Sequence, residues 1–172
     1  PDVLRAHARH VETGAVIPDD LVERLVAASK FDQGFSTVEY LASALVDLDL
    51  HDGTIDGTAD LMAAQAETLG RNGLPSAITM RHASPHFQHI FSGGAYASGY
   101  YSYMWSEVMD ADAFAAFKEA GWTFDTDVAD KLKTHILSAG GATDPAELYT
   151  RFRGRLPTVE ALLAKRGLDS PA

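Results

Sequence analysis

The sequence predicts an all-α protein made of many helices, with little or no β-sheet. Apolar residues recur at helical spacing along most of its 172 residues, and no segment sustains the alternation of apolar and polar residues that marks a strand. The 46% hydrophobic and 22% charged content is typical of a soluble globular chain. No apolar stretch approaches the ~20 residues that a membrane span needs, so we expect no membrane partner.

The first helices are predicted from their start signals and their apolar faces. Residues 2–12 form the first helix, and Pro18 opens the second. In the third, Ser36-Thr37-Val38-Glu39 is a capping box, in which side chains satisfy the free amides of the first turn. Its apolar residues follow at spacings of 3, 4 and 3: Val38, Leu41, Leu45 and Leu48. This spacing predicts a long and well-buried helix.

The middle of the chain changes from helix to irregular structure and back. A turn-prone loop at 51–54 ends the third helix, and a fourth fits residues 59–69. Prolines and glycines interrupt residues 74–95, which are predicted to be irregular. A tyrosine-rich helix then runs to about Asp110, and a short helix continues over 111–120.

The last helices have clear start signals. Asp125 is placed to cap a helix over residues 126–138. Asp144 is a predicted N-cap, because a proline follows it at the first helical position, where the missing amide costs nothing. A final helix follows Pro157.

The most distinctive segment covers residues 86–109, where two histidines, a glycine-rich loop and four tyrosines follow one another. Glycines let a backbone bend or approach a ligand, and tyrosine and histidine side chains are directional hydrogen-bond donors. Tyr96, Tyr100 and Tyr103 fall at i, i+4 and i+7, which puts three hydroxyls on one face if the helix extends back that far. Such a row of phenols suits a carbonyl or an oxyanion.

Six short stretches of sequence point to a family. Three lie in or after this segment: His-Ile-Phe-Ser-Gly at 89–93, Tyr-Ala-Ser-Gly-Tyr-Tyr-Ser-Tyr-Met-Trp-Ser-Glu-Val at 96–108 and Asp-Ala-Asp-Ala-Phe at 110–114. Three flank it: Phe-Asp-Gln-Gly-Phe-Ser-Thr-Val-Glu-Tyr-Leu at 31–41, Ile-Leu-Ser-Ala-Gly-Gly at 136–141 and Arg-Phe-Arg-Gly-Arg at 151–155. Together they resemble the C-terminal part of the thimet-oligopeptidase-like zinc metallopeptidases, in the branch of peptidyl-dipeptidase and oligopeptidase A. The stretch at 31–41 is more similar to the peptidyl-dipeptidase branch than to the oligopeptidase A branch.

The resemblance implies roles for individual residues. Tyr103 matches the tyrosine that stabilises the oxyanion of the tetrahedral intermediate, since a phenol donates a hydrogen bond without titrating at neutral pH. His89 and Tyr96 match residues that hold the substrate backbone near the scissile bond, and Tyr100 matches a position that lines the pocket beside it. Without the resemblance, the residues alone also allow a core tyrosine at 103 and a core or capping histidine at 89.

The glycine-rich loop has two interpretations. By position, Gly93 and Gly94 look like a substrate-binding hinge that closes the loop over a bound peptide and excludes water. The alternative is an ordinary glycine-rich turn.

The resemblance also implies zinc, held by His-Glu-x-x-His on one helix and by a glutamate on a following helix. No His-Glu-x-x-His occurs in these 172 residues, and the first residue is Pro1 rather than methionine. We therefore expect residues 1–172 to be a C-terminal catalytic-domain fragment that carries the substrate-binding segment and no metal ligands. The zinc-binding helices would belong to the missing N-terminal part of the same enzyme.

Three histidines, His82, His86 and His89, fall at i, i+4 and i+7, a spacing found in metal sites on helices. Pro85 interrupts such a helix, because it removes an amide donor and clashes with the preceding turn. No carboxylate lies within the trio. We therefore predict no native metal site at these histidines.

Three arginines form a small basic cluster near the C-terminal end: Arg151, Arg153 and Arg155. Guanidinium groups pair well with carboxylates, so they could bind the terminal carboxylate of a substrate. Structural ion pairs are the preferred interpretation.

Charge and cysteine content bound the partners and the compartment. A net charge of −10 argues against a nucleic-acid partner and an anionic membrane surface. The absence of cysteine excludes disulfides and thiolate metal sites and is compatible with a cytoplasmic location. No signal peptide is visible in this sequence.

The predicted function is part of a zinc-dependent peptidase that acts on short peptides, with release of C-terminal dipeptides favoured over internal cleavage. The chain alone is expected to be inactive. It is also expected to self-associate, because its tyrosine face would lack its usual cover. The alternative is a non-catalytic helical module whose aromatic face binds a peptide or a partner helix.

Overall fold

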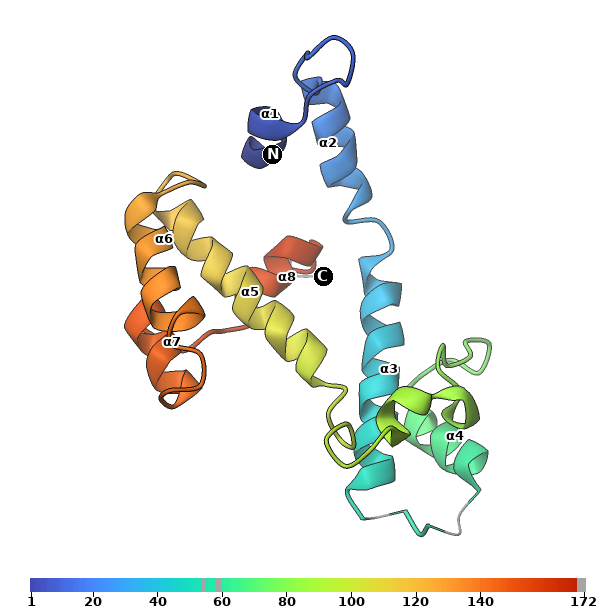
Figure 1. Ribbon diagram of the computed structural model, residues 1–172. Coiled ribbons are helices and arrows are strands. Elements are labelled where there is room, and N and C mark those ends of the chain that lie inside the picture. The colour runs from blue at the N-terminus through green and yellow to red at the C-terminus, as the bar shows by residue number, and fades with distance from the viewer. Residues whose placement is uncertain (54, 58–59, 170–172) are drawn as a thin grey trace. The chain divides into compact units, whose positions relative to one another are not determined.

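The computed structural model describes residues 1–53, 55–57 and 60–169. Across these ranges it contains eight α-helices, two 3₁₀ turns and one π-helical turn (Figure 1). The described chain forms no strand, only an isolated antiparallel bridge between Arg9 and Val16. The all-α prediction is therefore confirmed.

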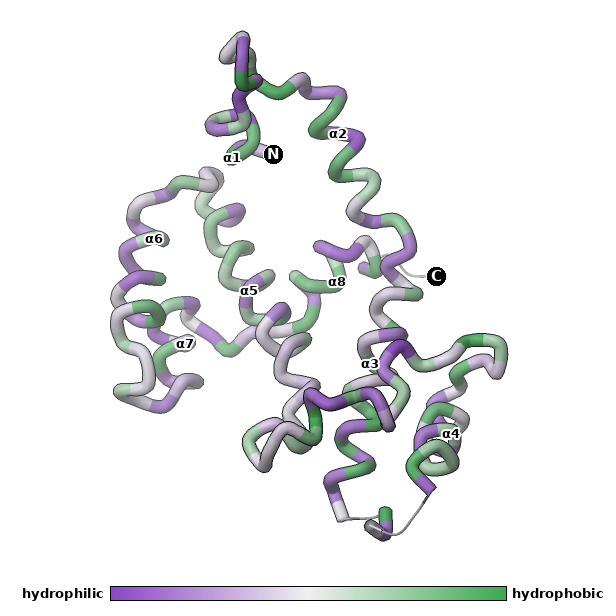
Figure 2. The backbone as a smooth tube through the Cα atoms, turned by 45° about the vertical axis from the view of Figure 1, so that its right-hand side comes forward, coloured by the Kyte–Doolittle hydropathy of each residue, from purple (hydrophilic) through white to green (hydrophobic). Residues whose placement is uncertain are grey.

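Hydrophilic residues interrupt the labelled helices, as Figure 2 shows. Consistent with this pattern, none of the helices in the described ranges is both long enough and apolar enough to cross a membrane.

The chain divides into two compact units, which we describe separately. The first unit combines Pro1–Gln33 with the chain from Glu107 onward. Its elements are α1 (Asp2–His7), α2 (Asp19–Ala28), most of α5 (Ser102–Glu119), α6 (Thr126–Leu132), the π-helical turn Lys133–Leu137, α7 (Pro145–Arg153) and α8 (Glu160–Arg166). The second unit is Gly34–Ser106. It holds α3 (Gln33–His51) almost entirely, α4 (Leu61–Arg71), the 3₁₀ turns η1 (Ser84–His86) and η2 (Gln88–Phe91), and the first turn of α5.

Two of the predicted N-caps are present as hydrogen bonds. The Asp125 carboxylate accepts from the Val128 amide at 2.9 Å, and the Asp144 carboxylate accepts from the Ala146 amide at 2.7 Å. In α4 the cap is Asp60, which accepts from the Met62 amide at 2.9 Å. The predicted start of that helix at residue 59 lies outside the described residues, as does residue 54 of the preceding loop.

Other predicted boundaries are wrong. The first helix ends at His7 instead of residue 12, because a turn follows in which the His10 ring nitrogen accepts from the amides of Glu12 and Thr13 at 3.3 Å. The third begins at Gln33, three residues before the predicted capping box. Asp32 reverses the chain there with φ 60°, a left-handed conformation that aspartate tolerates. Helix α5 runs unbroken past Asp110, so the two helices predicted on either side of that residue are one.

The buried face of α3 also differs from the predicted apolar stripe. Val38 and Leu41 are exposed, whereas Ala42, Ser43, Val46 and Asp47 are buried. The buried face includes polar residues that find partners far away in sequence, and apolar periodicity does not detect such partners.

The hydrophobic core of the second unit forms between α3, α4 and the two 3₁₀ turns. Its buried members are Ala42, Val46, Leu69, Met80, Phe87 and Ile90. Tyr100 packs against this core and is partly buried. The core thus ties the histidine-bearing turns and the tyrosine segment to the same side of α3.

A buried carboxylate organises α5 and α7 in the first unit. Asp112, with 1% of its surface exposed, accepts from the Tyr149 hydroxyl at 2.8 Å and from Arg155 at 2.5 Å. Arg153 lies 3.2 Å from the same carboxylate and forms two further bonds with Glu119, at 2.6 and 2.8 Å. These pairs confirm the structural interpretation of the arginine cluster.

The groups around Asp112 shift the pKa of its carboxyl. Burial by itself raises the pKa of the carboxyl. The hydrogen bonds from Tyr149 and Arg155 and the charge of Arg153 outweigh that effect, so the pKa lies below the ordinary value. A lowered pKa in the folded state contributes stability that is present above the unfolded-state pKa and is lost as the pH falls through the folded-state pKa.

We predict that Asp112→Asn lowers the free energy of unfolding by about 3–5 kcal/mol, because two guanidinium groups lose a buried charged partner. Asp110→Asn on the same helix breaks only an exposed pair with Lys165 and should cost less than about 1 kcal/mol. Denaturant unfolding at several pH values measures both. The gap between wild type and Asp112→Asn should begin to narrow as the pH falls below the unfolded-state pKa, about 4, and should close only as the pH falls through the lower folded-state pKa. Equal costs for the two variants would contradict this account.

Candidate active site

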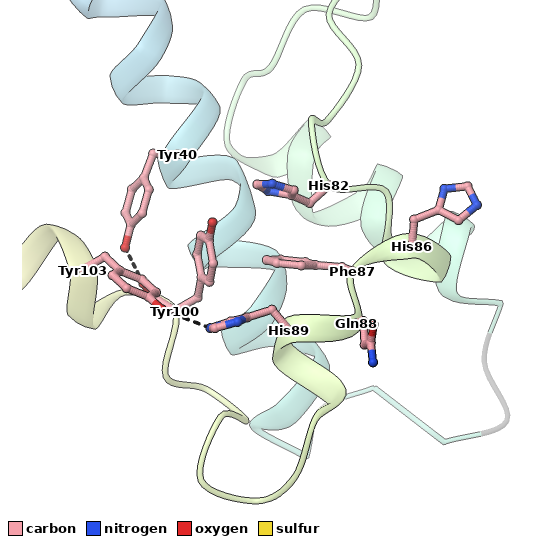
Figure 3. Close-up of a pocket in the computed structure, with 8 residues that line it drawn as sticks. All are labelled: Tyr40, His82, His86, Phe87, Gln88, His89, Tyr100 and Tyr103. Carbon is pink, nitrogen blue, oxygen red and sulfur yellow. Dashed lines mark hydrogen bonds between the residues drawn. The ribbon is translucent and has the colours of Figure 1, made fainter.

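An open cavity of about 410 Å³ lies in the second unit (Figure 3). Eight residues line it: Tyr40, His82, His86, Phe87, Gln88, His89, Tyr100 and Tyr103. Three of the predicted site residues, His89, Tyr100 and Tyr103, are among them. The walls are aromatic, and the polar atoms come from phenols and imidazoles.

The polar centre of the cavity is the pair of Tyr103 and His89. The Tyr103 hydroxyl lies 3.3 Å from Nε2 of His89, so either group can donate, depending on the histidine tautomer. The Tyr103 side chain is 52% exposed and His89 is half-buried. The pair therefore offers hydrogen-bond donors to a ligand in the cavity, instead of being sealed in the core.

The two 3₁₀ turns aim the histidine. Side chains three residues apart eclipse each other in a 3₁₀ turn. Phe87 and Ile90 accordingly lie in the core, where Phe87 also forms part of the cavity wall, and His89 faces the cavity without being buried. The buried Gln65 side chain on α4 fixes the start of the segment, because its oxygen accepts from the Ser84 amide at 2.8 Å and from the Ser84 hydroxyl at 3.0 Å.

The three histidines that had metal-like spacing do not share a helix. His82 stacks on Phe87 at 4.8 Å between ring centres, and its Nδ1 lies 3.1 Å from the Ser43 hydroxyl. Burial, and secondly the charge of Arg81, lowers the pKa of His82. His86 points away from the other two rings in Figure 3. In the described part of the chain, no group of three or more histidines, cysteines and carboxylates is placed to hold a metal ion.

The tyrosine segment reaches the cavity by a different route from the predicted one. Helix α5 begins at Ser102, so Tyr96 and Tyr100 do not lie on it, and the condition for the three tyrosines to share a helical face is not met. Ser98 has φ 57°, and a Cβ on Gly99 would lie 3.1 Å from the Tyr96 carbonyl oxygen. This left-handed, close-packed turn interrupts the helix there.

The three tyrosines nevertheless gather around His89. The centre of the His89 ring lies 5.0 Å from that of Tyr96, 5.7 Å from Tyr100 and 5.9 Å from Tyr103. Burial, and secondly the neighbouring Tyr103, raises the pKa of the Tyr100 phenol. Tyr100 therefore remains a neutral aromatic wall.

The predicted hinge glycines lie beside the cavity instead of in its wall. Gly93 has φ 135°, a conformation that side chains rarely adopt, so only this position of the pair requires glycine for its backbone. No other group crowds Gly94. The loop is exposed, and the Tyr96 amide donates to the Gly93 carbonyl at 2.9 Å. A hinge role stays a prediction.

Asp47, which holds the tyrosine segment, is not among the residues predicted from the sequence. Its side chain is fully buried and accepts from the amides of Ser98 at 3.1 Å and Tyr100 at 2.8 Å. Nδ1 of His51, one turn later, lies 2.9 Å from the same carboxylate. The only signal in the sequence is a carboxylate within the apolar run Ala44–Leu48.

Tyr40 was missed as well. Its hydroxyl donates to the Tyr100 carbonyl and accepts from the Met104 amide at 3.1 Å. Its ring stacks on Tyr100 with 5.4 Å between the centres. Tyr40 and three other polar residues of α3 follow at spacings of 3, 4 and 4, on one face of the helix: Tyr40, Ser43, Asp47 and His51.

The chain is similar in sequence to known proteins over nearly its whole length. Residues 1–168 match the family model described as Peptidase family M3. The chain is 37% identical over 172 residues to the probable cytosolic oligopeptidase A of Arabidopsis thaliana, an alignment covering 97% of this chain and 24% of that protein. It is 36% identical to the dipeptidyl carboxypeptidase of Salmonella typhimurium and to the oligopeptidase A of Escherichia coli, with 98% of this chain and 25% of each relative covered. The chain thus spans about a quarter of the length of the curated relatives it matches.

We predict that Asp47→Asn lowers the free energy of unfolding by about 2–3 kcal/mol, because the two backbone amides donate to different oxygens of the carboxylate, and in asparagine one of these is replaced by an NH2 group that cannot accept. Hydrogen exchange should show faster exchange of the Ser98 and Tyr100 amides. Glu39 lies on the same helix as Asp47 and forms an exposed pair with Arg81. Glu39→Gln makes the same chemical change there and should cost less than about 1 kcal/mol. Unchanged protection of both amides in Asp47→Asn would show that the carboxylate does not hold this loop.

Proposed function

The chain belongs to peptidase family M3, and from that membership we propose that it supplies the substrate-side wall of an active site that hydrolyses short peptides. The observation that carries the proposal is the half-exposed pair of Tyr103 and His89, 3.3 Å apart on an open cavity with aromatic walls. Hydrogen-bond donors aimed at one point of such a site suit the oxygen of a peptide carbonyl.

Each residue has a separate role in the proposed reaction. The Tyr103 hydroxyl donates to the carbonyl oxygen as negative charge develops on it, which favours the transition state over the bound substrate. His89 and Tyr96 hold the peptide backbone beside that oxygen. The Tyr100 ring forms the wall against which a side chain of the peptide packs.

The proposed enzyme also uses zinc. The residues of this chain do not fit a zinc site, because the sequence has no His-Glu-x-x-His and the described residues bring no suitable ligand cluster together. The ligands would lie outside these 172 residues.

Release of C-terminal dipeptides is the favoured specificity, and internal cleavage of oligopeptides is second. Overall identity does not separate the two, because the chain is 36% identical both to a dipeptidyl carboxypeptidase and to an oligopeptidase A. The stretch at 31–41, which is more similar to peptidyl-dipeptidase, supports this order. The relatives at 37% identity include one named cytosolic and one named chloroplastic or mitochondrial, so family membership does not assign a compartment.

In the enzyme that contains this chain, Tyr103→Phe should lower kcat by roughly 10²–10³-fold and leave KM nearly unchanged. The lost hydroxyl would act mainly in the transition state. Steady-state kinetics with a quenched peptide measures both constants. A variant within about twofold of wild type in kcat would mean that Tyr103 only packs, and would favour the peptide-binding module instead.

The chain alone should show no peptidase turnover, with or without added zinc, because its sequence has no His-Glu-x-x-His and its described residues form no metal site. The assay should use the species that light scattering coupled to size exclusion defines, since the exposed tyrosines support the proposal that the chain self-associates. Chelator-sensitive hydrolysis that co-purifies with the chain would overturn this prediction.

A further inference from the structure

Tyr40 contacts the tyrosine segment at the first turn of α5. The first four amides of an α-helix have no carbonyl partner within the helix. In α5 the Met104 amide is one of them, and it donates to the Tyr40 hydroxyl at 3.1 Å. A phenol on another helix therefore caps this turn.

The same hydroxyl also ties the residue that precedes the helix. It donates its proton to the Tyr100 carbonyl and so bridges Tyr100 and Met104. Tyr103 lies between these two residues, and its own amide makes only a long bond of 3.4 Å to the Tyr100 carbonyl. The bridge thus fixes the backbone on both sides of Tyr103.

We propose that Tyr40 is a positioning residue that holds the first turn of α5 so that the Tyr103 hydroxyl stays beside His89. Asp47 fixes the chain upstream, at Ser98 and Tyr100, and leaves the turn that carries Tyr103 to a second anchor. Figure 3 shows Tyr40 and His89 approaching the Tyr100–Tyr103 turn from different elements.

The consequence for catalysis rests on the proposed function. An oxyanion donor is effective only at the correct distance, and a misplacement of about 1 Å can reduce a rate by about 10²-fold. Tyr40 acts on the reaction only by positioning Tyr103. Removing the Tyr40 hydroxyl should therefore lower kcat only while the Tyr103 hydroxyl is present.

A structural experiment on the 172-residue chain tests the positioning directly. Tyr40→Phe keeps the ring that stacks on Tyr100 and removes only the bridging oxygen. NMR should show the nuclear Overhauser contacts between the Tyr103 and His89 rings weakened in this variant, with at least about tenfold faster exchange of the Met104 amide. Tyr101→Phe is the matched control, because Tyr101 is exposed, precedes α5 directly and does not line the cavity. It should leave both signals unchanged.

The unaltered chain provides a test that needs no variant. Its Met104 amide should exchange slowly for a helix start and show a contact to the Tyr40 ring. Fast exchange without that contact would overturn the proposal. Unchanged ring contacts and exchange in a folded Tyr40→Phe chain would also overturn it.

A double-mutant cycle tests the catalytic consequence in the enzyme that contains the chain. Tyr40→Phe should lower kcat by about 10- to 100-fold with KM within about twofold, and should have less than a twofold effect when Tyr103 is already phenylalanine. If the effects of the two substitutions on kcat multiply in the double variant, Tyr40 acts independently of Tyr103, which would refute the positioning role. If Tyr103→Phe itself leaves kcat unchanged, the proposed function fails, and the NMR comparison still decides whether Tyr40 holds the turn.

Discussion

The arrangement of the cavity depends on one buried charge, the carboxylate of Asp47. A charged group without solvent must be satisfied by hydrogen bonds, and Asp47 finds these in two backbone amides and one imidazole. The amides belong to Ser98 and Tyr100, about fifty residues further along the chain. The need to satisfy this carboxylate therefore draws the tyrosine segment onto α3, and Ser98 adopts its left-handed conformation within that contact.

The rest of the site extends the same principle along α3. The polar face of this helix contacts three separate pieces of the site: Tyr40 holds the start of α5, Ser43 meets His82, and Asp47 holds the tyrosine loop. Among the described residues, no buried side-chain nitrogen or oxygen lacks a hydrogen-bond partner. Fully satisfied networks of this kind specify one geometry, because each partner has to be in its place. The residues that contact a ligand are thus set by a layer of residues behind them.

The first unit uses a buried carboxylate for a different purpose. Asp112 joins Tyr149 and two arginines into a charged cluster that contains none of the predicted site residues. The Arg-Phe-Arg-Gly-Arg stretch of the family resemblance is accounted for here by ion pairs. Matching sequence in a family therefore marks structural anchors as well as chemistry.

The sequence by itself determined the all-α class, several helix caps and the segment that bears the chemistry. These are local properties: Asp125 and Asp144 cap the helices that directly follow them, and helical periodicity needs only neighbouring residues. The family resemblance singled out His89, Tyr96, Tyr100 and Tyr103, and the structure gathers their rings.

Only the tertiary structure decided how these rings meet and which face of α3 is buried. A helical face through Tyr96, Tyr100 and Tyr103 was the wrong reason for their proximity, since α5 starts after the first two. No local pattern revealed what Tyr40 and Asp47 hold, because their partners in the tyrosine segment lie 51 to 64 residues away. Hydrogen bonds across such separations depend on the folded chain, so spacing along the sequence could not reveal them.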